Sequence, residues 1–149
     1  SALEKTRDLL TDTELFCVCN CDDLLDRQGI IQAFNAGKVS IGLTHTTMPA
    51  NYLQIEIANG EMTGFSRSPQ DSKDKIEGLY SNGFYMLSGK VFEFDKVSAG
   101  KGEFGLPQTL FANLKDFPLK VSIFDHWQPV NCPEDVPKAE EFIEKFLVI

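Results

Sequence analysis

A short apolar run that ends abruptly in polar residues constrains this chain more than any other feature. Residues Leu15–Cys19 lack the alternation of a half-exposed strand, which predicts a strand buried on both faces, as in a parallel sheet. Asp23 follows shortly and can cap a helix that runs to Phe34. A second strand, Val39–Thr44, comes next. Strand, helix and strand in this order predict a βαβ unit.

The rest of the chain adds strands, short helices and a hairpin. Tyr52–Ile57 and Met62–Phe65 flank Asn59-Gly60, a strong signal for a two-residue hairpin turn. The remaining predicted elements are helices Ala2–Leu10 and Pro107–Leu114, strands Tyr80–Leu87 and Leu119–Phe124, and a closing helix that starts at Pro133. Together they predict an α/β fold with an open, mixed, mostly parallel sheet, flanked by helices and carrying an inserted β-hairpin.

Length and charge narrow the classes of function. The 149 residues suit one domain, taken as residues 1–149. Lys and Arg number 14 against 22 Asp and Glu, a formal charge of -8, which argues against general nucleic-acid binding because that needs a basic surface. The sequence has no apolar run of about 20 residues and no signal-like start, so we expect no membrane partner and a cytoplasmic protein.

The four cysteines are expected to be free thiols. Cys17, Cys19 and Cys21 alternate, so on a strand they share one face, whereas structural zinc sites usually pair their cysteines across a turn. Small buried hydrophobic side chains in a reducing compartment are therefore the favoured interpretation.

Two polar clusters follow predicted strands, and both are candidates for a ligand site. They are Asn20–Asp23 and Asp125–Asp135. Ligands of open α/β sheets bind beyond the carboxyl ends of strands, and magnesium prefers one or two carboxylates plus substrate phosphates. The alternative is that Asp22 and Asp23 only cap the next helix. A hydrolase triad is not favoured, because no Ser or Cys stands in an elbow such as G-x-S-x-G. Asp125 and His126 could pair as base and orienting group, but adjacent residues on a strand face opposite ways.

Six segments, in order along nearly the whole chain, match the motifs of one family. They are Phe16–Asp22, Tyr52 with Ile55–Ile57, Gly60–Pro69, Ser81–Tyr85, Gly102–Phe111 and Trp127–Glu140. The first, for example, is similar to a "strand, Asn-Gly-Asp" segment. Together they resemble the sugar-phosphate nucleotidyltransferases, which have a Rossmann-like, glycosyltransferase-A-type fold. Val130–Asp135 is also similar to the "Val-Asn-Thr-Pro-Glu" segment of molybdopterin guanylyltransferases, which share that fold.

The resemblance implies an Mg²⁺-dependent enzyme that joins a nucleoside triphosphate (NTP) to a sugar phosphate and releases pyrophosphate. Asp22 matches the first metal-binding aspartate of the family and would be the catalytic residue. The second metal aspartate is replaced by Pro129, so Asn131 or Asp125 would complete the metal site. The substrate-binding residues that the resemblance implies are Tyr52, Arg67, Asn82, Gly83 and Tyr85.

Other departures from the family pattern support a second hypothesis. Leu53 adds a side chain where a bare glycine backbone lets the sugar approach, and Arg67 and Ser68 replace a Glu-Lys pair. Ser81 stands where the family has an asparagine. The alternative is therefore a non-catalytic, nucleotidyltransferase-like module that binds a partner or senses a nucleotide sugar.

The family also begins with a glycine-rich loop that cradles the triphosphate, and nothing before Leu15 matches it. We therefore expect a partial nucleotidyltransferase-like domain, lacking the N-terminal strands and inactive alone. Its strand Leu15–Cys19 would have an open edge. That edge would be covered by a second copy or by a chain supplying the N-terminal half, with NTP and sugar phosphate as ligands of the complete enzyme.

Overall fold

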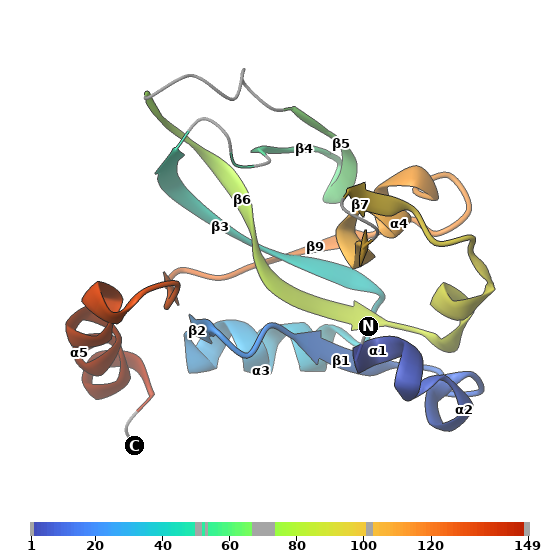
Figure 1. The fold of residues 1–149 in the computed structure, drawn as a ribbon, viewed down its shortest axis with the longest axis horizontal. Coiled ribbons are helices and arrows are strands. Elements are labelled where there is room, and N and C mark those ends of the chain that lie inside the picture. The colour runs from blue at the N-terminus through green and yellow to red at the C-terminus, as the bar shows by residue number, and fades with distance from the viewer. Residues whose placement is uncertain (1, 50–51, 53, 67–73, 101–102, 148–149) are drawn as a thin grey trace.

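The computed structural model describes residues 2–49, 52, 54–66, 74–100 and 103–147. In this part of the chain a six-stranded sheet has the order β1-β6-β3-β9-β5-β4 (Figure 1). Its strands are β1 (Phe16–Cys19), β3 (Ser40–Pro49), β4 (Gln54–Ala58), β5 (Glu61–Ser66), β6 (Lys75–Leu87) and β9 (Lys120–Ile123). Two smaller pairs are β2 (Asp23–Leu25) with β10 (Trp127–Pro129), and β7 (Ser98–Gly100) with β8 (Glu103–Phe104).

Five strands of the main sheet close into a small barrel, which we call the ring. They are β6, β3, β9, β5 and β4. β6 pairs antiparallel with β3, and β3 pairs with β9 in the one parallel pairing among the described strands. The hairpin β4–β5 bridges the remaining gap, with Glu61 opposite Lys120 of β9 and Gln54 opposite Tyr80 of β6. The prediction of an open, mostly parallel, Rossmann-like sheet is therefore wrong.

The length of β6 explains that difference. Its 13 residues pair with β1 at the C-terminal end, where Phe16 lies opposite Leu87, and with β4 at Tyr80, near the middle of the strand. β6 lies between β1 and β3 and runs antiparallel to both, so the two strands of the predicted βαβ unit are not neighbours.

The hairpin signal itself is confirmed. Asn59 and Gly60 have φ angles of 53° and 75°, the pair of positive values that a type I′ turn requires. The hairpin is part of the ring, however, and not an insertion attached to it.

The core lies on both faces of β6. Tyr85 and Leu87 pack in one apolar cluster with Ile41 and Leu43 of β3. Phe84 and Met86, which point the other way, pack in a second cluster that contains Phe124, Leu25 and Ala33. Both faces are buried at the C-terminal end of the strand, which explains the unbroken apolar and aromatic run Phe84–Leu87 there.

Helix α3 (Arg27–Ala36) covers the second cluster and lies beneath the sheet in Figure 1. Its N-cap is Asp26, whose Oδ1 accepts a hydrogen bond of 2.7 Å from the Gly29 amide. The predicted cap, Asp23, is on β2 instead. The predicted start of this helix is therefore wrong, because β2 precedes the helix and Asp26 caps it. Gly29 has no side chain, and a Cβ there would overlap the Phe124 ring, so glycine permits this close packing.

The other helices flank the ring and the two-stranded β2–β10 pair, which we call the ladder. They are α1 (Ala2–Lys5), α2 (Arg7–Leu10), the 3₁₀ turn η1 (Gly89–Glu93), α4 (Leu106–Ala112), the 3₁₀ turn η2 (Pro133–Asp135) and α5 (Val136–Phe146). Figure 1 shows α5 at the end of the molecule, beside β2. Among the described residues, no helix has both the length and the apolar character needed to span a bilayer.

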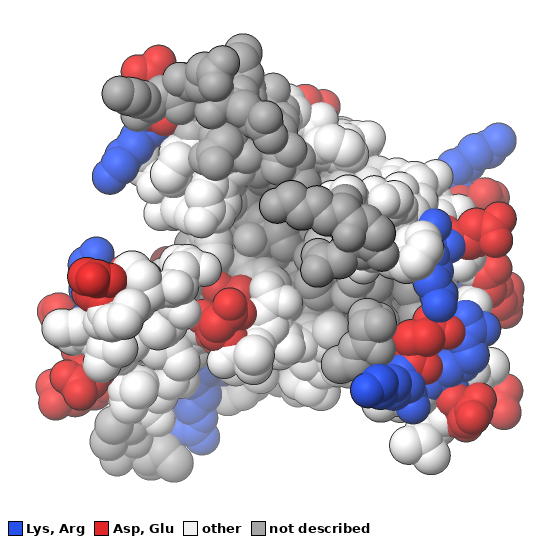
Figure 2. Space-filling model, in the orientation of Figure 1, with Lys and Arg blue, Asp and Glu red and all other residues white. Residues whose placement is uncertain are grey.

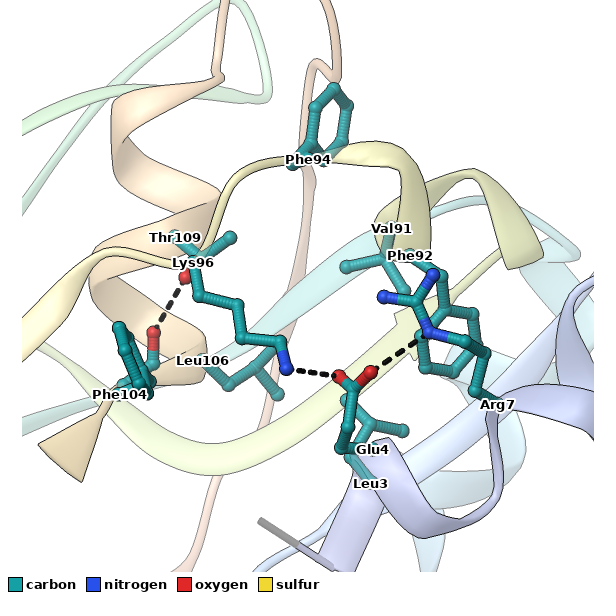
Figure 3. A pocket seen from close by; sticks show the side chains of 11 residues that line it. Leu3, Glu4, Arg7, Val91, Phe92, Phe94, Lys96, Phe104, Leu106 and Thr109 are labelled. Atoms are coloured by element: carbon teal, nitrogen blue, oxygen red, sulfur yellow. Dashed lines mark hydrogen bonds and ion pairs between the residues drawn. The ribbon is translucent and has the colours of Figure 1, made fainter.

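Glu4 of α1 forms two ion pairs, one with Arg7 of the neighbouring helix α2 and one with Lys96, which lies in the rest of the fold. The Glu4 carboxylate lies 2.8 Å from Arg7 Nε and 3.1 Å from Lys96 Nζ (Figure 3). They border a small cavity of about 60 Å³ with walls that include Val91 and Phe92. The Arg7 guanidinium also lies 5.4 Å from the centre of the Phe92 ring, a cation–π contact that joins α2 to η1.

The cysteines are exposed, and the prediction that they are buried is wrong. Phe16 and Val18 of β1 face the core, so Cys17 and Cys19 face outward. Partial desolvation, with a smaller effect of Cys19, raises the pKa of the Cys17 thiol to about 11. All four are free thiols.

Candidate functional site

The site is built where the chain leaves the main sheet after β1. Asn20 follows that strand, its backbone N–H donates to Gly83 O at 3.1 Å, and a turn leads into β2. β2 pairs antiparallel with β10, placing Asp23 opposite Pro129. The Val130 amide then donates to the Asp22 carbonyl at 2.8 Å. Two segments more than 100 residues apart in the sequence are thus fixed side by side.

A pocket of about 180 Å³ opens between this ladder and the ring. Its lining residues are Asn20, Asp22, Asp23, Tyr52, Ser81, Trp127, Pro129 and Asn131. Of the residues predicted from the sequence, Asp22, Tyr52 and Asn131 are brought together here. Figure 2 shows the molecule hollowed at this end, between α5 and the strands, with acidic side chains on the wall of the hollow.

Asp23 forms hydrogen bonds to two other residues that line the pocket, Trp127 and Asn20. Its Oδ1 accepts a hydrogen bond of 2.6 Å from Trp127 Nε1, and its Oδ2 accepts one of 2.9 Å from Asn20 Nδ2. Burial raises the pKa of this carboxyl, and the two N–H donors oppose that shift. Sequence reasoning missed this role of Asp23, because the direction of its side chain depends on the pairing of β2 with β10, about 100 residues away.

Asp22 has different surroundings. It is exposed, and within the described residues its carboxylate makes no hydrogen bond and no ion pair. Asn131 is exposed as well, and its backbone amide donates to Asp135 Oδ2 at 3.0 Å. These two side chains therefore offer oxygen ligands at one pocket.

Those ligands fit Mg²⁺ of the kind that keeps several waters and binds substrate phosphates through one or two carboxylates. A complete protein cage is not present: within the described ranges no group of three or more His, Cys, Asp or Glu side chains is placed to hold a metal ion.

Asp125, the alternative metal ligand, does not line this pocket. It lies in a separate hollow with Asp26, Arg27 and Lys145. Between the two residues considered from the sequence, the geometry favours Asn131.

The predicted sugar-side residues behave differently from one another. Asn82 is fully buried and bonded to Thr44 Oγ1 at 3.1 Å and to the Phe84 amide at 3.3 Å. Tyr85 is also buried, and its hydroxyl lies 3.2 Å from Ser81 Oγ, which does line the pocket. Tyr85 therefore contacts the pocket wall through Ser81. Arg67, with Leu53 and Ser68, lies outside the described residues.

Gly83 stands behind the pocket wall. Its φ of +78° favours glycine, and a Cβ there would overlap Asp23 Oδ2 and Asn20 Nδ2. This glycine thus leaves room for the hydrogen bond between those two residues.

This chain is similar to known proteins in structure. No family model matches the sequence, and curated proteins give no match. A Bacillus anthracis protein assigned as a glucose-1-phosphate thymidylyltransferase and solved with sucrose has a TM-score of 0.74 at 16% identity, with 99% of this chain and 61% of that chain covered. The inositol-1-phosphate CTP transferase of T. maritima has a TM-score of 0.72 at 14% identity, covering 97% and 60%.

A third similar structure is apo UDP-glucose pyrophosphorylase, with a TM-score of 0.71 at 17% identity, covering 97% of this chain and 59% of that one. The chain thus spans about 60% of the length of each of the three. At such identities the likeness concerns the fold alone. The resemblance predicted from the motifs is confirmed at that level: this chain has the fold of a large part of the sugar-phosphate nucleotidyltransferases.

Proposed function

We propose that this chain is the part of a sugar-phosphate nucleotidyltransferase that carries a metal-binding aspartate and the sugar side of the active site. The complete enzyme would transfer a nucleotidyl group from an NTP to a sugar phosphate and release pyrophosphate. The observation that supports this most is the single pocket that gathers Asp22, Tyr52 and Asn131 from three separate segments.

Each residue has a role that follows from its chemistry. Asp22 and Asn131 would hold Mg²⁺, which when bound neutralises phosphate charge. Tyr52 and Ser81 offer a ring and hydroxyl groups to a sugar, and the Tyr85 hydroxyl steadies Ser81 from behind. Asn82 and Gly83 would shape the wall without touching the ligand.

The pocket carries negative charge and, among the described residues, no Lys or Arg lines it. A triphosphate carries several negative charges, so basic groups from beyond this pocket are needed in addition to the metal ion. We therefore expect the isolated chain to release no pyrophosphate. A second copy, or a chain supplying the other part of the domain, would complete the site. The exposed free thiols suit a reducing compartment, which supports the cytoplasmic location expected from the sequence.

Metal binding tests the proposal directly. Titration calorimetry with Mg²⁺, alone and with UTP, should show binding to the unmodified chain and none to Asp22→Asn. Asp125→Asn is the matched control, because it removes one carboxylate of the same type from a different hollow. Equal binding by Asp22→Asn and the unmodified chain would refute the assignment.

A second candidate function is a non-catalytic module that binds a nucleotide sugar. Pro129 favours it, because this residue lies in the pocket at the position where the resemblance has a second metal aspartate and offers no side-chain ligand. Binding of UDP-glucose that does not depend on Mg²⁺ or Asp22 would support this candidate over the enzyme.

A further inference from the structure

We propose that the adjacent aspartates of the pocket have different tasks: Asp23 is a positioning residue that fixes Trp127 and Asn20, and Asp22 alone is left to bind ligands. The assignment of ligand binding to Asp22 rests on the function proposed above. The role of Asp23 rests on the hydrogen bonds of the folded chain.

Both oxygens of Asp23 are engaged by N–H donors from different directions. Oδ1 receives the Trp127 indole from β10, and Oδ2 receives the Asn20 amide from the end of β1. Bonds from N–H groups to a carboxylate are roughly twice as strong as bonds between neutral groups. Asp23 therefore joins the ladder to the main sheet through its side chain as well as through the backbone.

The surroundings of Asp23 reinforce this arrangement. Pro129, its cross-strand neighbour, has no N–H and no side-chain polar atom with which to compete for the carboxylate. Gly83 leaves the space that the Asn20–Asp23 bond occupies, because a Cβ there would overlap both partners. Three segments of the chain thus converge on one half-buried carboxylate.

Asp22 shows the opposite pattern. Its backbone carbonyl is fixed by the Val130 amide, but its carboxylate has no partner within the described residues. The backbone bond thus places Asp22 at the pocket, where its side chain has no hydrogen-bond donor from the part of the chain that the structure describes.

A consequence is that the aromatic wall is in place before any ligand arrives. The indole ring of Trp127 is fixed at its nitrogen, so binding need not order this side chain. Loss of the Asp23 carboxylate would release both Trp127 and Asn20, although neither the metal ligand Asp22 nor its backbone bond to Val130 is altered.

The chain has one tryptophan, so its spectrum has one indole N–H resonance. That resonance reports on the bond from Trp127 Nε1 to Asp23 without further assignment. In ¹H–¹⁵N spectra, Asp23→Asn should shift that resonance upfield. Exchange of the indole proton with water should accelerate by roughly tenfold or more, as expected for loss of a bond to a charged acceptor. Asp22→Asn should leave both quantities unchanged.

Mg²⁺ titration of the same two variants completes the test. Asp23→Asn should still bind Mg²⁺, and Asp22→Asn should not. An unshifted indole resonance in folded Asp23→Asn, or an equal shift in Asp22→Asn, would overturn the proposed division. If Asp23→Asn does not fold, Trp127→Phe removes the donor and keeps the ring. Exchange of the Asn20 side-chain amide should then stay slow, and rapid exchange would overturn the independent role of Asp23 toward Asn20.

The two proposals fail in distinguishable ways. Absence of Mg²⁺ binding by the unmodified chain would contradict the metal site and with it the ligand role of Asp22. The indole measurements need no ligand, so they would still decide the positioning role of Asp23.

Discussion

Substitution of Gly83 by alanine tests whether the pocket wall depends on a missing side chain. Two costs add at this position. Alanine at a φ of +78° costs about 1–2 kcal/mol, and the overlap with Asp23 and Asn20 breaks a charge-assisted bond whose loss costs about 1.5–3 kcal/mol. The sum, roughly 2.5–5 kcal/mol, corresponds to a fall in Tm of roughly 5–20 °C for a domain of this size.

Gly37→Ala is the matched control. Gly37 also has a positive φ, +59°, but nothing lies within 4 Å of a Cβ built there. This variant should therefore lose only the conformational cost of about 1–2 kcal/mol. Urea unfolding followed by circular dichroism gives both free energies. Equal losses in the two variants would show that the wall absorbs the extra methyl group and that the space behind Asp23 is not needed.

Two further predictions concern a buried amide and an exposed thiol. Asn82→Ala should lower the free energy of unfolding by about 2–4 kcal/mol, because it leaves two buried partners unsatisfied and a cavity behind, while Mg²⁺ affinity stays unchanged; a loss below about 1 kcal/mol in urea, or lost Mg²⁺ binding in the folded variant, would contradict a structural role. For Cys17, whose pKa is raised to about 11, the thiolate fraction grows about tenfold per pH unit below that value, so iodoacetamide labelling of a variant with the other three cysteines changed to serine should keep accelerating from pH 8 to 10, and a plateau near pH 9 would contradict the raised pKa.

The sequence was sufficient to predict those elements whose conformation depends on neighbouring residues alone. Asn59-Gly60 predicts its hairpin because a two-residue turn with two positive φ angles leaves few residue choices. The strand Leu119–Phe124 was also predicted, and β9 occupies Lys120–Ile123. The ring was not predictable in this way, because the pairs that close it, Gln54 with Tyr80 and Glu61 with Lys120, join distant segments.

The site shows the same division. Asp22, Tyr52 and Asn131 were found through motifs, and the structure gathers them at one pocket. Asp23 was taken for a helix cap because Asp23 and Asp26 are both chemically suitable for that task. Only the pairing of β2 with β10 determines that Asp26 caps the helix and Asp23 enters the site. No local pattern carries that information.

The position of the β2–β10 ladder outside the main sheet has a mechanical consequence. Helix α5 contacts both strands of the ladder, and Phe142 of α5 is buried. Tyr52 and Ser81 belong to the chain segments of the ring, whereas Asp23, Trp127 and Asn131 belong to the ladder and the residues after it. The pocket therefore lies between the ring and the ladder, and its width depends on how the ladder is oriented relative to the ring. A substitution at Phe142 that tilts the ladder would alter the pocket without replacing any residue that lines it.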